Sequence, residues 1–146
     1  MRIAIVVSRF NDFVTDRLLA GAQEVLHEAG ISDADVDVLR VPGAFELPIA
    51  AQRAAETGRV NAVVCLGCLI RGATPHFEYI SSACAHGITA AAAATGVPMA
   101  FGVLTTNSVE EALERAGPGS DNKGREAARA ALEMARLFDS YGNLRP

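Results

Sequence analysis

The chain has 146 residues, 50% of them hydrophobic, and a formal net charge of −4 at pH 7. Its Lys and Arg side chains are scattered among acidic ones, so nucleic acid is a poor candidate partner. This length predicts a single domain, residues 1–146, with a core large enough to be stable without disulfides.

Apolar, β-branched runs and amphipathic stretches alternate along the chain, which predicts alternating strands and helices. Such alternation is typical of a parallel sheet with right-handed crossovers and helices on both faces. We therefore expect a flavodoxin-like, single-domain, three-layer α/β/α sandwich with a four-stranded parallel sheet. The predicted strands are residues 2–8, 36–41, 60–66 and 99–104. The predicted helices are residues 14–29, from the 42–48 turn to 58, 74–95, 108–117 and about 122–138.

Ligands of parallel α/β sheets bind beyond the carboxyl ends of the strands, which directs attention to the loops. In the loop after the third strand, Thr74 is expected to cap a helix and Pro75 to occupy its first position. The backbone amides of Gly72, Ala73 and Thr74 are then free to bind a phosphate at the helix N-terminus. His76 follows as a candidate proton acceptor. The alternative is an ordinary capped turn with a solvated histidine.

Three other loops carry candidate binding residues. Phe10, after the first strand, can stack on a flat heterocycle or cover the local core. Glu46, after the second strand, can bind hydroxyl and ring N–H groups or serve as a helix cap. Arg115 and Lys123 flank a Gly-Pro-Gly turn, where they can hold an anion or lie solvated.

The three cysteines, Cys65, Cys68 and Cys84, form an odd set in apolar surroundings, which favours reduced thiols in the core. A zinc site that includes His76 or His86, or a redox C-x-x-C pair, is the weaker interpretation. Redox pairs usually lie exposed at a helix N-terminus, whereas Cys65 falls in a predicted strand. We therefore expect no metal site.

The N-terminal residues enter an apolar strand without a charged leader and cleavage site, so we expect no secretory signal. The longest apolar tract, residues 80–104, is interrupted by polar residues, glycine and proline and is mostly alanine. It is too weakly apolar for a membrane span. A cytoplasmic protein is expected.

Taken together, these loops resemble the lumazine synthase family along residues 3–134. The resemblance rests on five ordered motifs. They are residues 8–11 (SRFN), 41–48 (VPGAFELP), 66–77 (LGCLIRGATPHF), 101–105 (FGVLT), and 115–117 (RAG) together with 122–124 (NKG).

The resemblance implies a transferase of riboflavin biosynthesis that needs no metal or organic cofactor. In its penultimate step, the family condenses 5-amino-6-(D-ribitylamino)uracil with 3,4-dihydroxy-2-butanone 4-phosphate, giving 6,7-dimethyl-8-ribityllumazine, phosphate and water. His76 would shuttle protons during imine formation, phosphate elimination and ring closure. The implied substrate-binding set is Phe10 for the pyrimidine, Ala44 and Glu46 with Phe45 for the ribityl chain, Leu66, Gly67, Cys68, Leu69 and Ile70 beside the ring, Gly72, Ala73, Thr74 and Arg115 for the phosphate, and Phe101 and Lys123 near the site.

The resemblance also implies a homo-oligomer. In the family the pocket lies between neighbouring subunits, and Phe101, Arg115 and Lys123 would come from the second chain. A homopentamer is expected, with an icosahedral sixty-subunit shell as the larger alternative. Family members often carry a segment that adds a strand to the neighbouring subunit, but here the first strand begins almost at Met1, so strand exchange is not expected. The Pro118-Gly119 pair also departs from icosahedral members, which commonly have Thr-Lys there.

Other functions stay open from the residues alone. The archaeal type of riboflavin synthase resembles this fold but would use two lumazine molecules, and the phosphate turn with His76 argues against it. A non-catalytic flavodoxin-like module would bind a flavin or phosphorylated ligand without turnover. A shell protein that has lost catalysis is a third reading.

Overall fold

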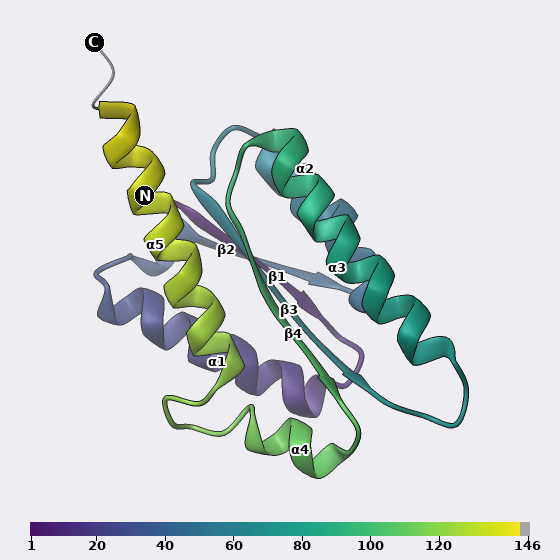
Figure 1. Ribbon diagram of the computed structural model, residues 1–146. Coiled ribbons are helices and arrows are strands. Elements are labelled where there is room, and N and C mark those ends of the chain that lie inside the picture. Colours follow the sequence, from purple (N-terminus) through teal and green to yellow (C-terminus); the bar gives the residue numbers. More distant parts are fainter. Residues whose placement is uncertain (144–146) are drawn as a thin grey trace.

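The computed structural model describes residues 1–143, in which a four-stranded sheet lies between two layers of helices (Figure 1). All four strands are parallel and pair in the spatial order β2-β1-β3-β4. This arrangement confirms the predicted three-layer α/β/α fold. The strands are β1 (Ile3–Ser8), β2 (Val36–Val41), β3 (Ala62–Ile70) and β4 (Met99–Thr106).

The helices α1 and α5 cover one face of the sheet, and α2 and α3 cover the other (Figure 1). A short helix, α4, connects β4 to α5. The bounds are α1 (Asp12–Glu28), α2 (Leu47–Glu56), α3 (His76–Thr95), α4 (Val109–Glu114) and α5 (Lys123–Asn143), with one-turn 3-10 helices η1 (Asp33–Asp35) and η2 (Ala44–Glu46).

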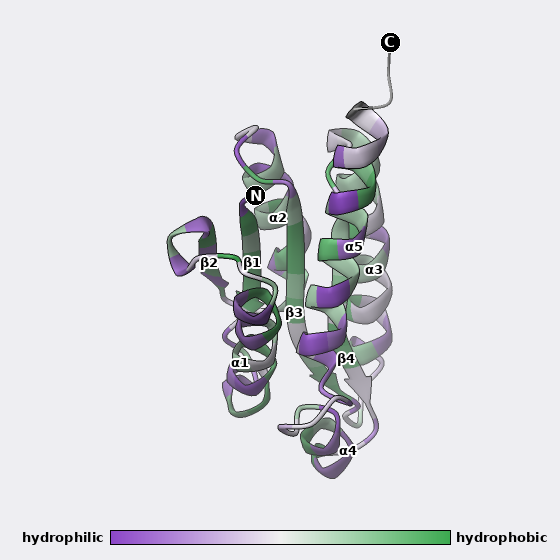
Figure 2. Cartoon of the chain, turned by 90° about the vertical axis from the view of Figure 1, so that its left-hand side faces the viewer, coloured by the Kyte–Doolittle hydropathy of each residue, from purple (hydrophilic) through white to green (hydrophobic). Residues whose placement is uncertain are grey.

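The core lies on both faces of the central strands, because successive side chains of a strand point to opposite sides. Ile5 and Val64 pack toward α1 and α5, whereas Val6 and Val63 pack toward α2 and α3. Every residue of β1 is buried, as is every residue of β3 except the last. Figure 2 shows β1 and β3 as mostly hydrophobic, whereas α1 and α5 carry many hydrophilic residues. Continuous apolar runs thus indicated strands that helices cover on both faces.

The strand β3 is longer than predicted, since it continues through Ile70 instead of ending at residue 66. Its partner β4 also continues, to Thr106, and Ile70 lies opposite Thr106 in the register. Gly67 reads in the sequence as an interruption, but a Cβ there would lie 3.2 Å from Leu47 Cδ1. The glycine therefore allows α2 to pack closely on the strand, and pairing with β4 sets its length.

Several helix ends also differ from the prediction, since α2 ends at Glu56 rather than residue 58 and α4 at Glu114 rather than residue 117. Helix α1 begins at Asp12 rather than residue 14, because Asn11 adopts a left-handed conformation with φ of 62° and its carbonyl accepts from the amides of Val14 and Thr15. Helix α5 runs to Asn143 rather than ending at residue 138. Beyond residue 138 the first glycine is Gly142, and no proline precedes it, so no strong local signal stops the helix earlier.

The predicted Ser108 cap of α4 is confirmed, since Ser108 Oγ accepts a hydrogen bond of 3.1 Å from the Glu111 amide. The Glu111 carboxylate accepts in turn from the Asn107 amide at 3.2 Å, one residue before the position that a standard capping box would use. Within residues 1–143, none of the helices combines the length and hydrophobicity that a membrane crossing requires.

Candidate active site

An open cleft of about 740 Å³ lies at the carboxyl ends of β1, β2 and β3. This is the edge at which parallel α/β sheets bind ligands. The structure therefore brings together residues from three separate loops. The predicted site residues that line the cleft are Phe10, Ala44, Phe45, Glu46, Leu69, Ile70, Gly72, Thr74 and His76.

Phe10 stands at the cleft with 63% of its surface exposed and belongs to neither core cluster. The loop that carries it is fixed on both sides. Its amide donates to Pro42 O at 3.1 Å, and Asn11 Nδ2 donates to Cys68 O at 2.9 Å. The ring is thus held in place without being used for packing, which leaves its face available for stacking on a planar ligand.

Glu46 lies half-buried in the cleft at the end of η2. It occupies the N-cap position of α2, but its side chain makes no capping hydrogen bond there. The alternative interpretation of Glu46 as a helix cap is therefore wrong. Its carboxylate stands at the cleft beside the exposed ring of Phe45, where it can accept hydrogen bonds from ligand hydroxyl or N–H groups.

The turn before α3 starts the helix differently from the prediction. Pro75, rather than Thr74, is the N-cap residue, because its carbonyl accepts from the amides of Glu78 at 3.1 Å and Tyr79 at 3.4 Å. Thr74 therefore lies one position outside the cap, and no side chain caps α3. The predicted Thr74 cap is wrong, and its absence leaves the amides at this helix end unoccupied by side-chain oxygens.

His76 is the first residue of α3, and its exposed side chain lines the cleft. Tyr79 and Ile80, three and four residues later, line the same cleft, as does Phe77. Sequence reasoning missed these three residues. For Tyr79 and Ile80 the available signal was helical periodicity, since residues three and four apart share one face of a helix with His76.

Seven members of the predicted set do not line the cleft within this chain, and four of them belong to β3 and the turn after it. Leu66 and Cys68 lie inside β3 with at most 1% of their surface exposed, and their side chains point toward α1 and α5. Gly67 lies between them, and Ala73 is exposed in the turn. Because β3 extends to Ile70, only its last two residues reach the cleft.

Phe101, Arg115 and Lys123 lie away from the cleft of their own chain. Phe101 is 38% exposed on β4, an edge strand of the sheet. Arg115 and Lys123 are held together, since the Lys123 amide donates to Arg115 O at 2.8 Å, and Lys123 Nζ pairs with Glu126 at 3.4 Å.

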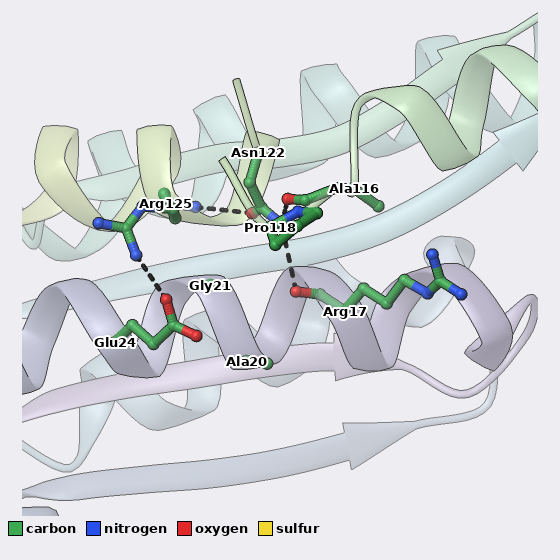
Figure 3. A pocket seen from close by; sticks show the side chains of 9 residues that line it. Arg17, Ala20, Gly21, Glu24, Ala116, Pro118, Asn122 and Arg125 are labelled. Atoms are coloured by element: carbon green, nitrogen blue, oxygen red, sulfur yellow. Dashed lines mark hydrogen bonds and ion pairs between the residues drawn. The ribbon is translucent and has the colours of Figure 1, made fainter. Parts of the chain in front are cut away.

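A second, smaller pocket of about 280 Å³ lies between α1 and the loop before α5 (Figure 3). Asn122 is buried there, and both polar atoms of its side chain form hydrogen bonds. Its Nδ2 donates to Arg17 O and Gly117 O, and its Oδ1 accepts from the Arg125 amide at 3.0 Å. Arg125 reaches Glu24 of α1 at 2.6 Å. These contacts hold the start of α5, and with it Lys123, against α1.

The three cysteines are free and buried, which confirms the prediction of core thiols. Cys65 and Cys68 are three residues apart on one strand, so they point to opposite faces and belong to different core clusters. Burial, and then the neighbouring Cys84, raises the pKa of the Cys65 thiol to about 12. Within residues 1–143, no group of three or more His, Cys, Asp or Glu side chains is placed to hold a metal ion.

One family of known proteins matches this chain. The family model described as 6,7-dimethyl-8-ribityllumazine synthase matches residues 1–139 of the 146. The matched segment contains the whole sheet and every residue that lines the cleft. It also contains Phe101, Arg115 and Lys123, which do not line the cleft.

Proposed function

Because the chain belongs to the 6,7-dimethyl-8-ribityllumazine synthase family, whose members are transferases of riboflavin biosynthesis, we propose that its cleft joins 5-amino-6-(D-ribitylamino)uracil to 3,4-dihydroxy-2-butanone 4-phosphate. The products are 6,7-dimethyl-8-ribityllumazine, phosphate and water. One observation carries the proposal. Phe10, Glu46, an uncapped helix N-terminus and His76 meet in one cleft of about 740 Å³.

The pyrimidine substrate is placed at the η2 side of the cleft. The exposed Phe10 ring stacks on its heterocycle, and Leu69 and Ile70 border the ring. The Glu46 carboxylate, which caps no helix, accepts hydrogen bonds from the ribityl hydroxyls. This division fits the cleft chemistry, because apolar surface meets the flat ring and a single carboxylate meets the polyol.

The phosphate of the second substrate is placed at the turn of residues 72–74. This turn leads into the N-terminus of the 20-residue helix α3, which carries roughly half a positive charge. Backbone amides at such an end bind anions well when side chains do not occupy them. The absence of a side-chain cap on α3 supports this placement.

His76 then stands next to the phosphate and transfers protons. Imine formation, phosphate elimination and ring closure each move a proton, and an imidazole can accept and return it near neutral pH. The condensation itself is chemically undemanding. Holding the two reactants side by side can contribute several kcal/mol, so positioning carries much of the rate.

The active unit is an oligomer, and we propose a homopentamer. None of the residues that line the cleft within one described chain is a lysine or arginine, although the ligand is a phosphate ester. Phe101, Arg115 and Lys123 of a neighbouring subunit would complete the site with the missing cations. An icosahedral assembly of such pentamers would use the same cleft. We place this activity in the cytoplasm.

The direct test mixes the purified protein with both substrates and follows the absorbance of the lumazine product. A Phe10→Ala, Arg115→Ala double variant is measured beside it, with Arg53→Ala as the control, since Arg53 lies on α2 outside the cleft. We expect turnover in the parent and the control and its loss in the folded double variant. No turnover in the parent would contradict the enzyme proposal and leave a ligand-binding or shell protein.

A further inference from the structure

Arg71 is the residue that follows β3, and its side chain leaves the cleft. Ile70 and Gly72, on either side of it, both line the cleft, whereas Arg71 does not. Its amide donates to Thr106 O at 2.8 Å, and its Nε donates to Asn107 Oδ1 at 3.0 Å. Both the backbone and the side chain of Arg71 therefore join the end of β3 to the loop after β4.

The same guanidinium also reaches the first turn of α3. It donates from a terminal nitrogen to Glu78 Oε1, and its centre lies 4.7 Å from the centroid of the Phe77 ring. The side-chain hydrogen bond from Arg71 is the main cause that lowers the pKa of Glu78. One side chain thus connects the start of the turn, the start of α3 and the loop after β4.

The turn of residues 72–74, between Arg71 and the start of α3, has few other contacts that would fix its conformation. Gly72, Ala73 and Thr74 are all exposed, and within the described part of the chain none of them makes a hydrogen bond. A Cβ added to Gly72 would meet open space. The conformation of the turn therefore depends on how firmly its two ends are held.

We propose that Arg71 is a positioning residue for the phosphate of the substrate. It holds both ends of the 72–74 turn, so that the amides stay directed at the cleft, and it does so without touching the phosphate. It also neutralises Glu78, whose carboxylate would otherwise oppose an anion at the same helix end. The inference rests on the proposed function in one respect, namely that the ligand at this turn is a phosphate ester.

A direct role for Arg71 as a phosphate ligand makes a different prediction at Asn107. We call the contacts of Arg71 with Thr106, Asn107, Phe77 and Glu78 the Arg71 clamp. Removing Asn107 Oδ1 breaks one hydrogen bond of this clamp without changing any charge. A positioning role then requires weaker phosphate binding. A direct role requires unchanged or stronger binding, because the guanidinium becomes freer to turn toward the cleft.

The experiment compares Arg71→Met, Asn107→Ala and Arg71→Lys with the parent. Arg53→Met serves as the control, because it removes an arginine from the ion pair with Glu56 on α2, away from the turn. Two readouts are used. The first is hydrogen exchange of the Glu78 and Tyr79 amides, which bond to Pro75 O. The second is KM for each substrate separately, together with kcat.

We expect Arg71→Met and Asn107→Ala both to speed exchange of the two amides about threefold and to raise KM for the butanone phosphate about fivefold, as suits a half-exposed cluster. KM for the pyrimidine and kcat should stay within about twofold of the parent. Arg71→Lys should recover less than half of the loss, because a single ammonium cannot reproduce the planar fork. The control should match the parent.

The proposal is overturned if Asn107→Ala leaves both readouts unchanged, whatever Arg71→Met does, since the clamp would then be dispensable. A rise in KM of equal size for both substrates would also overturn it. If the parent shows no turnover, the proposed function fails by itself. Exchange of the Glu78 and Tyr79 amides then still decides whether Arg71 holds the turn.

Discussion

At the scale of single residues, the cleft contains few polar side chains. Glu46 and His76 both line it, but they lie on different elements, at the end of η2 and at the start of α3. Among the described residues that line the cleft, His76 carries the only imidazole. Removing it therefore tests acid–base transfer without removing the surfaces that hold the substrates.

We expect His76→Ala to lower kcat about 10- to 100-fold without abolishing turnover. The loss is at the low end for general acid–base catalysis, because positioning by the cleft survives the substitution. Steady-state kinetics of product absorbance measure it. His86→Ala is the matched control, since His86 lies on the same helix and bonds to Ser82 O rather than lining the cleft. Complete loss in a folded His76→Ala protein would mean that the imidazole is indispensable.

The buried thiols make stability fall in alkaline solution. Burial raises the pKa of Cys65 from 9.0 to about 12 and that of Cys68 and Cys84 to about 11. The folded state therefore keeps protons that the unfolded state loses above pH 9. This contribution is complete below pH 9 and is lost as the pH rises through the folded values.

We predict that Cys65→Ala makes the fall in unfolding free energy between pH 9 and 10 shallower by up to about 1.4 kcal/mol per pH unit, the value for one proton. Urea unfolding at pH 8, 9 and 10 measures the slope. The neighbouring Val64→Ala is the control, because it also removes buried atoms from β3 but nothing that titrates. Equal slopes in the parent and Cys65→Ala would refute the prediction.

At the scale of elements, α1 and α5 cross with their backbones in contact. A Cβ added to Gly124 would lie 2.0 Å from Leu18 O, and one added to Gly21 would lie 2.4 Å from Asn122 Oδ1. No side chain can fit in the first of these spaces without moving a backbone. The pair of glycines thus sets the distance between the two helices and, through Asn122, the position of Lys123.

Gly124→Ala should therefore lower the unfolding free energy by about 1–3 kcal/mol or more, even though alanine favours helices. Gly142→Ala in the same helix is the control, because a Cβ there meets open space and should leave stability unchanged or slightly higher. Denaturant unfolding compares the two. If Gly124→Ala were as stable as the parent, the two helices would have to separate more easily than this packing implies.

At the scale of the whole molecule, the proposed site is divided between copies of the chain. The cleft supplies the ring-stacking surface and His76, while Arg115 and Lys123 lie together beyond it. A single subunit therefore contains both kinds of residue but does not combine them. In the proposed oligomer, one copy would present Arg115 to the cleft of the next and so complete the proposed phosphate site.

We predict that two impaired variants restore activity when their subunits are mixed. His76→Ala and Arg115→Ala chains, unfolded together in equal amounts and refolded, should form mixed oligomers in which about one quarter of the sites carry both native residues. Lumazine formation in the mixture should exceed the mean of the separate variants. Activity equal to that mean would place His76 and Arg115 in the same subunit's site, or make Arg115 irrelevant.

Much of the fold and of the cleft follows from local sequence patterns. Continuous apolar runs predicted β1 and β3, because only strands covered on both faces bury nearly every side chain. The loops after the first three strands predicted Phe10, Glu46 and His76 as cleft residues, since parallel strands place their carboxyl ends at one edge. These inferences needed only neighbouring residues and the rule of strand alternation.

The remaining features depend on contacts between residues far apart in the chain. Strand pairing extended β3 to Ile70, and Pro75 rather than Thr74 took the cap of α3. Arg71 meets Asn107 across 36 positions, because the strand order places β4 beside β3. Local propensity carries no information on such contacts, since their energy arises only after the sheet has brought the segments together. Local patterns thus predicted the elements and most residues of the cleft, whereas packing between distant segments set where the elements end and which residues contact the turn.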